Sequence, residues 1–159
     1  MRKIHIDQSV KNIVHSDIVY LDLEHLAQVE ISSECHEHPI ESALVEGSNL
    51  GWQAASSGEQ IIRLVFDQPQ VIKQIVLLFD EPEMSRTQEF VLLWRMDKDD
   101  FFREILRQQY NFSQPLTTQE IENISVDLKQ VKALELRIIP DISGGEAWAK
   151  LTRLRISAT

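Results

Sequence analysis

Apolar and polar residues alternate along several short segments of the chain, with turn residues between the segments. In one of them, Ile62, Leu64 and Phe66 fall on one face of an extended chain, whereas Arg63 and Asp67 fall on the other. Alternation with a period of two residues is typical of a strand that buries one face against a core. Strands of this kind are predicted at residues 17–23, 26–32, 60–67, 70–80, 87–97, 121–128, 131–140 and 149–157.

About eight strands at this spacing, with no long helical pattern between them, predict an all-β fold: an antiparallel sandwich or jelly roll. Residues 101–112 fit either an amphipathic helix or a strand, and the strands on both sides favour a strand. One short helix is predicted within residues 38–47, where Pro39 suits the first turn and Gly47 suits the end.

Length and composition indicate one soluble domain over residues 1–159. The single cysteine, Cys35, excludes an internal disulfide, and no segment approaches the ~20 apolar residues of a membrane helix. The N-terminal residues lack the apolar run of a signal peptide, so a cytoplasmic protein without membrane contact is expected. Sixteen basic against 25 acidic residues give a net charge of −9, which opposes binding to nucleic-acid phosphates.

An ordered series of weak motifs covers residues 17 to 157. A strand ends at Ser32–Ser33, a short helix follows, and a Gly-x-x-x-x-Trp segment spans Gly47 to Trp52. "GEQIIRLVFDQPQVIKQI", "RTQEFVLLW" and "WAKLTRLRI" follow in turn. This order resembles the galactose-binding-like jelly rolls, which include discoidin domains, coagulation-factor C-type domains and carbohydrate-binding modules. The resemblance implies the fold more strongly than a function.

One feature of these jelly rolls, a bound calcium ion, is not expected in this chain. Many members hold a calcium ion with an Asp-Gly pair after the short helix and a Glu on the closing strand. The corresponding positions here are Glu46-Gly47 and Arg153, and an arginine opposes a cation that needs several oxygen ligands. Loss of the calcium site is therefore expected.

The segment "CHEHPIE" offers several metal-ligating side chains. His36, His38 and Glu41 resemble the first motif of the cupins, which are metal-dependent jelly-roll enzymes. The leading glycine of that motif is Glu30 here, and no histidine follows His38 to supply the second motif. The segment is therefore interpreted as a polar rim loop before the helix, with no metal or cofactor predicted.

Catalytic motifs are equally weak. The chain has no Gly-x-Ser-x-Gly elbow, no phosphate-binding glycine loop and no His-Glu-x-x-His. Cys35 and His36 are neighbours, so on a strand they point to opposite faces and do not form a nucleophile–base pair. No catalytic residue is predicted, and the protein is not expected to be an enzyme.

Ligand binding is then expected at the loops of one end of the sandwich. The resemblance places its ligand loops at "ECHEHP", "EGSNLGW", "EPEMSR" and "SGGEAW", whereas Trp52 and Trp94 are assigned to the core. Carbohydrate or another small polar ligand is the favoured partner, because sugars bind aromatic faces flanked by polar groups. The candidate ligand-binding residues are Glu34, His36, His38, Asn49, Arg86 and Trp148.

Two alternatives remain. "WQAASSGEQI" resembles the N-terminal domain of the X-ray repair scaffold protein, which implies a protein or nucleic-acid interaction domain. A cupin-like metal-dependent enzyme using His36, His38 and Glu41 is the less favoured alternative.

Overall fold

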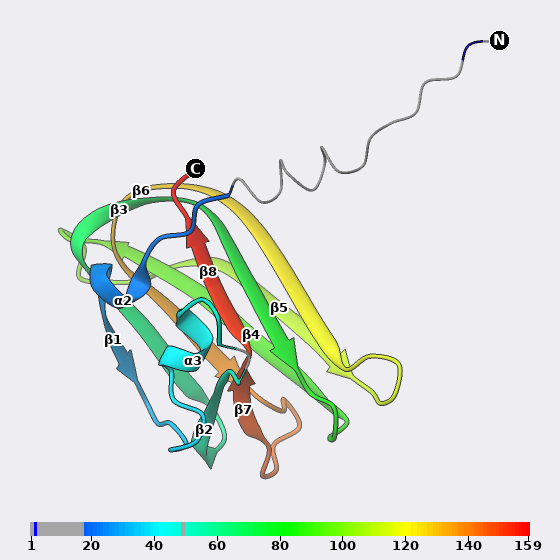
Figure 1. Cartoon of the computed structure of the whole chain (residues 1–159). Helices are drawn as coiled ribbons and strands as arrows, with labels where there is room; N and C mark the ends of the chain where they lie inside the picture. Colours follow the sequence, from blue (N-terminus) through cyan, green and yellow to red (C-terminus); the bar gives the residue numbers. More distant parts are fainter. Residues whose placement is uncertain (1, 3–17, 49) are drawn as a thin grey trace.

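Two layers of antiparallel strands form the sandwich predicted from the sequence (Figure 1). The computed structural model describes residue 2, residues 18–48 and residues 50–159. Among these residues, no helix is long and apolar enough to cross a membrane. The elements in chain order are α2 (Leu23–Leu26), β1 (Ala27–Ile31), α3 (Glu41–Leu44), β2 (Trp52–Ser57), β3 (Gln60–Asp80), β4 (Arg86–Met96), β5 (Arg103–Phe112), β6 (Gln119–Ile139), β7 (Trp148–Leu151) and β8 (Arg153–Ser157).

The two longest strands, β3 and β6, connect the layers. They pair antiparallel from Gln60 opposite Ile138 to Asp80 opposite Gln119. The first part of β3 also pairs with β1, whereas its second part pairs with β8. The two-strand ribbon therefore arches from one layer into the other (Figure 1).

The arch explains why each long strand was predicted as two. The β3–β6 register shifts between Val65 and Gln74, and Gln130 has a φ of 57°. Such irregularities are β-bulges, which bend a strand and tolerate Pro69 within it. The sequence signals at these points therefore mark bends and not the ends of strands.

Large apolar side chains from both layers fill the space between them. Trp52 is 1% exposed, as the sequence predicted, and Trp94 packs against the core while partly buried. The rings of Phe79 on β3 and Phe90 on β4 stack across the sandwich with centroids 5.5 Å apart. Full burial of such a ring contributes roughly 1.5–3 kcal/mol, so these contacts dominate the cohesion of the two layers.

Three boundaries differ from the predictions. The described part of residues 17–23 is not a strand, although the Leu21 amide donates to the Ile156 carbonyl at 2.8 Å. Strand β2 was missed, because its polar Ser56-Ser57 end has the composition of a turn. The predicted strand 149–157 is divided at Thr152 into β7 and β8, which pair with different partners.

Residues 103–112 do form a strand, β5, as predicted. The predicted helix is a single turn, α3, preceded by Pro39 and followed by Gly47 at a φ of 89°. Gly47 therefore has the left-handed conformation that favours glycine after a helix.

A buried arginine of the closing strand holds the end of α3. The Arg155 guanidinium donates to the carbonyls of Ala43 at 2.9 Å and Val45 at 3.3 Å. Burial lowers the pKa of Arg155, and the nearby Arg153 charge acts in the same direction. Arg153, which the resemblance matched to the calcium-binding Glu of the closing strand, is exposed on the same strand. A guanidinium thus binds the carbonyls that a helix end leaves without donors.

Replacing Arg155 by methionine is predicted to lower the free energy of unfolding by about 2–3 kcal/mol, because buried carbonyls lose their donors. Urea unfolding followed by circular dichroism measures the change. The matched variant Arg153→Met, on the same strand but exposed, is predicted to stay within about 0.5 kcal/mol of the parent protein. Equal effects of the two variants would contradict the assignment.

Candidate functional site

Three loops meet at one end of the sandwich. They connect β3 to β4 (residues 81–85), β5 to β6 (residues 113–118) and β6 to β7 (residues 140–147). The C-terminus lies at the opposite end (Figure 1).

Trp148 lies in a hollow at this loop end. It begins β7 after a turn in which Gly144 and Gly145 have φ values of 89° and 88°. The side chain is 41% exposed, in contrast to the buried Trp52. The hollow has a volume of about 480 Å³, and its other lining residues are Glu81, Glu83, Met84, Ser85, Glu146 and Lys150.

A charged chain of contacts forms the floor of the hollow. Lys150 Nζ lies 3.3 Å from Glu81 Oε2, and Arg86 Nε donates to Glu81 Oε1 at 2.9 Å. Burial alone would raise the pKa of Glu81, but the hydrogen bond from Arg86 and the charge of Lys150 lower it below its ordinary value. Glu81 is therefore a carboxylate at neutral pH.

Arg86 connects this floor to the rest of the loop end. Its Nη1 donates to the Pro140 carbonyl at 2.6 Å and to Gln88 Oε1 at 3.1 Å. The guanidinium also lies 4.8 Å from the centroid of the Phe112 ring. Because Arg86 is 4% exposed, its role is to hold the loops and Glu81 in place from below.

The buried carboxyl group of Glu120 extends this network of contacts beyond Gln88. Gln88 Nε2 donates to Glu120 Oε1 at 3.1 Å, while Glu120 Oε2 has no hydrogen-bond partner among the described residues. Burial, and after it the neighbouring carboxyl group of Glu122, raises the pKa of Glu120 to about 8. Glu120 is therefore protonated at neutral pH, although it does not line the hollow.

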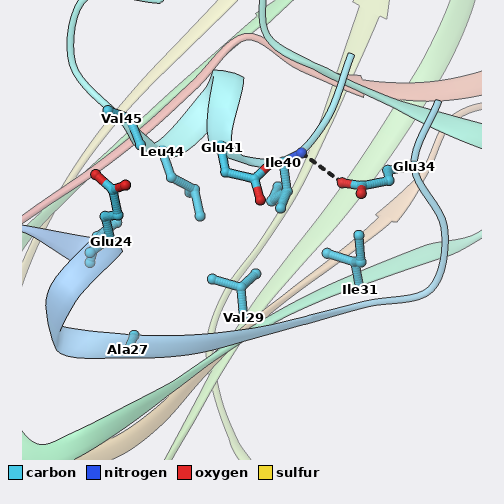
Figure 2. Close-up of a pocket in the computed structure, with 10 residues that line it drawn as sticks. Glu24, Ala27, Val29, Ile31, Glu34, Ile40, Glu41, Leu44 and Val45 are labelled. Atoms are coloured by element: carbon cyan, nitrogen blue, oxygen red, sulfur yellow. Dashed lines mark hydrogen bonds between the residues drawn. The ribbon is translucent and has the colours of Figure 1, made fainter. Parts of the chain in front are cut away.

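The other residues predicted to bind ligand are more dispersed. His38 lines a smaller hollow of about 200 Å³ that also includes Lys150, and its Nδ1 lies 3.1 Å from the Leu50 carbonyl. Glu34 accepts from the Ile40 amide at 2.9 Å and lines a separate groove on the flank of the sandwich (Figure 2). His36 is exposed, and Asn49 lies outside the described residues. Trp148 and His38 are thus the predicted residues that line the two hollows containing Lys150.

The structure does not bring the cupin-like residues together. His38 and Glu41 line different hollows, and a tight turn runs from Cys35 to His38. Across residues 18–48 and 50–159, the metal-ligating atoms that lie within 4.8 Å of one another belong to Asp22, Glu24 and His25. These three are exposed, and His25 Nδ1 is already 2.7 Å from Asp22 Oδ2.

Sequence reasoning missed Lys150 and the acidic rim of the hollow. Lys150 lies two residues after Trp148, so the period of a strand places both side chains on the same face. That signal was available in "WAKL". The contribution of Glu81 could not be predicted from the sequence, because its contacts depend on how the β3–β4 loop folds against Arg86.

Comparisons with known proteins identify the fold. No protein-family model matches the chain, and no curated protein sequence matches it. Solved structures of carbohydrate-binding modules match most of this chain, which therefore has their β-sandwich, jelly-roll fold. One match is the family 32 carbohydrate-binding module of AlyQ in complex with 4,5-unsaturated mannuronic acid, with a TM-score of 0.63, 17% identity, and coverage of 89% of this chain and 99% of that module.

Two further modules have the same fold. A pectin-binding carbohydrate-binding module has a TM-score of 0.60 and 20% identity, covering 85% of this chain and 93% of that one. A family 32 module from Clostridium perfringens, in complex with GalNAc-β-1,3-galactose, has a TM-score of 0.63 and 16% identity. It covers 88% of this chain and 100% of that one.

The raised pKa of Glu120 predicts that stability falls as pH rises. Between about pH 4.5 and 8 the unfolded chain releases this proton while the folded chain keeps it. The free energy of unfolding therefore falls by up to about 1.4 kcal/mol for each unit that the pH rises. Glu120→Gln is predicted to raise the melting temperature at pH 8, to leave it nearly unchanged at pH 4 and to flatten the slope between them.

Thermal unfolding from pH 4 to 8 measures this slope. Glu104→Gln, which removes a largely exposed carboxylate on β5, is the matched control and is predicted to keep the parent slope. An unchanged slope in Glu120→Gln would show that Glu120 titrates normally.

Proposed function

We propose that this protein is a non-catalytic carbohydrate-binding module that binds a neutral saccharide at the loop end. The observation that carries the proposal is the exposed Trp148 side chain in a hollow with a polar rim. The face of an aromatic ring packs against the C–H groups of a sugar, and neighbouring donors and acceptors bind its hydroxyls.

The polar groups of the hollow suit hydroxyl recognition. Lys150 supplies donors, while Ser85, Glu83 and Glu146 supply acceptors. Glu81 keeps acceptor capacity beside its contacts with Arg86 and Lys150, since a carboxylate has about four lone-pair sites. The set therefore includes both donors and acceptors around one aromatic ring.

The buried network supports the proposal by holding the site in a binding-ready form. Arg86 links the β3–β4 loop to the Pro140 carbonyl and to β4, so these loops do not need to be ordered by the ligand. Preorganisation of this kind preserves affinity, because binding does not have to offset the entropy of ordering a loop.

Charge favours a neutral ligand. Three carboxylates, from Glu81, Glu83 and Glu146, surround Trp148 against one lysine. The similar modules include complexes with an uronic acid and with a neutral disaccharide. The acidic rim repels the carboxylate of a uronic acid, so galactose-type and other neutral sugars are the proposed ligand class for this chain.

A catalytic role is disfavoured by the same charges. Glycoside hydrolysis needs a carboxylic acid with a raised pKa beside the scissile bond. In the hollow, the pKa of Glu81 is lowered, and the carboxyl with a raised pKa, Glu120, is buried outside the hollow. These two pKa directions support the proposal of a site that holds a ligand without donating a proton to it.

A glycan array with neutral and uronic-acid oligosaccharides tests the proposal, followed by calorimetric titration of the best ligand. We expect binding to neutral glycans, and Trp148→Ala is predicted to weaken it at least about tenfold through loss of the ring contact. Phe101→Ala is the matched control, because Phe101 is also an exposed aromatic residue but lies in the β4–β5 turn at the other end.

Unchanged affinity in Trp148→Ala would contradict the proposed site. Binding to uronic acids alone would contradict the neutral class, and no binding across the panel would contradict a carbohydrate ligand.

A further inference from the structure

A second concave surface lies on the flank of the sandwich, away from Trp148. It is a groove of about 400 Å³ between β1 on one side and the helical turns α2 and α3 on the other (Figure 2). Its apolar surface comes from Leu23, Val29, Ile31, Ile40 and Leu44. Glu24, Glu34 and Glu41 line it as well.

One wall of the groove is the free edge of a sheet. Strand β1 is the last strand in the sheet order and pairs with β3 on one side. The Ser32 amide donates to the Ile61 carbonyl, which makes Ser32 opposite Ile61 a hydrogen-bonded pair. In an antiparallel ladder the peptide groups alternate, so those of Val29 and Ile31 point away from β3. Within the described chain, no strand pairs with that side of β1.

The opposite edge of the sheet is built differently. Strand β5 carries charged, exposed side chains, and Arg107 forms ion pairs with Glu89 and Glu104. Charges on an edge strand discourage pairing with another chain. On β1, Glu30 forms an ion pair with Arg63 on one face, whereas Val29 and Ile31 on the other face line the groove and are only half-buried. The β1 edge thus combines free peptide groups with an apolar surface.

The charge of the groove specifies its occupant. Among its ten lining residues, all of them described, three are acidic and none is basic. Glu34 is engaged through Oε2 with the Ile40 amide, while Glu24 and Glu41 are exposed. The net charge of −9 adds to the attraction of cations toward this surface.

We propose that the groove binds an extended, basic segment of a partner protein, which adds a strand to the free edge of β1. Every second side chain of that segment faces the groove: apolar ones lie over Val29 and Ile31, and lysine or arginine side chains on the same face meet Glu24 and Glu41. Strand addition of this kind draws affinity from main-chain hydrogen bonds and selectivity from alternate side chains. The proposal uses none of the residues of the carbohydrate site.

The probe is a synthetic peptide of about eight residues, in which valine and lysine share the alternate positions that face the groove and threonine occupies the others. Its length exceeds that of β1. Fluorescence polarisation with the full chain measures its binding. We expect saturable, salt-sensitive binding, with no binding of a peptide that has glutamate in place of lysine. N-methylation of the amides on one edge of the peptide is expected to weaken binding at least about tenfold, because it removes the donors that pair with β1.

Two double variants locate the surface. Glu24→Lys with Glu41→Lys is expected to weaken the basic peptide about tenfold, because it reverses two exposed charges. Glu83→Lys with Glu146→Lys makes the same change at the loop end and is expected to leave peptide binding unchanged. Amide exchange by NMR adds an independent readout, with protection of Val29 and Ile31 expected only after peptide is added.

Four outcomes would overturn the proposal. They are no binding of the basic peptide, equal binding after N-methylation, equal effects of the two double variants, and protection of Val29 and Ile31 without peptide. In the last case, protection that rises with protein concentration would indicate a second copy in the groove. Protection independent of concentration would indicate another part of the same chain.

Discussion

The buried guanidinium of Arg86 is the interaction on which the loop end depends. It contacts Glu81 in the β3–β4 loop, Gln88 on β4, the Pro140 carbonyl after β6 and the Phe112 ring on β5. Removing one partner of a buried ion pair leaves an unpaired charge and typically costs about 3–5 kcal/mol. The start of β4 with its preceding loop, the end of β5 and the segment after β6 therefore share a single anchor beneath the exposed Trp148.

The arch of β3 and β6 determines which parts of the chain reach that anchor. Because the ribbon turns between layers at the bulges near Gln70 and Gln130, both of its ends return to the same end of the sandwich. One end of the ribbon leads into the Glu81 loop, and the other leads into the loop before Trp148. The fold thus brings the loops of the site together at one end, and the contacts of Arg86 hold these loops to one another.

Much of the fold was predictable because alternation reports burial directly. Ile62, Leu64 and Phe66 face the core as their period indicated, and residues 103–112 pair as a strand. The long strands were predicted as separate pieces because a bulge and a chain break have similar local composition, with Pro69 as the example. Strand β2 was missed because its final serines carry no apolar pattern.

The site was less predictable, because the role of a charged residue depends on its burial and partners. Arg86 was a predicted ligand residue, yet its guanidinium is buried beneath the loops; Trp148 was predicted from its turn and lies in the hollow. Lys150 could have been predicted, because the two-residue period of a strand places it on the same face as Trp148. The acidic groove beside β1 could not have been predicted, since it joins residues from α2, β1 and α3 that no linear motif connects.

Trp148, and not the core of the sandwich, is proposed to meet a neutral sugar. The protein has three tryptophans, so ¹H–¹⁵N spectra contain three indole signals, from the exposed Trp148, the buried Trp52 and the partly buried Trp94. Titration with galactose-terminated and N-acetylgalactosamine-terminated oligosaccharides is predicted to shift the Trp148 indole signal. The Trp52 signal, whose N–H donates to the Ser33 carbonyl at 3.0 Å, is predicted to stay in place. An unchanged chemical shift for the Trp148 indole, or a change confined to Trp52 and Trp94, would contradict sugar binding at Trp148.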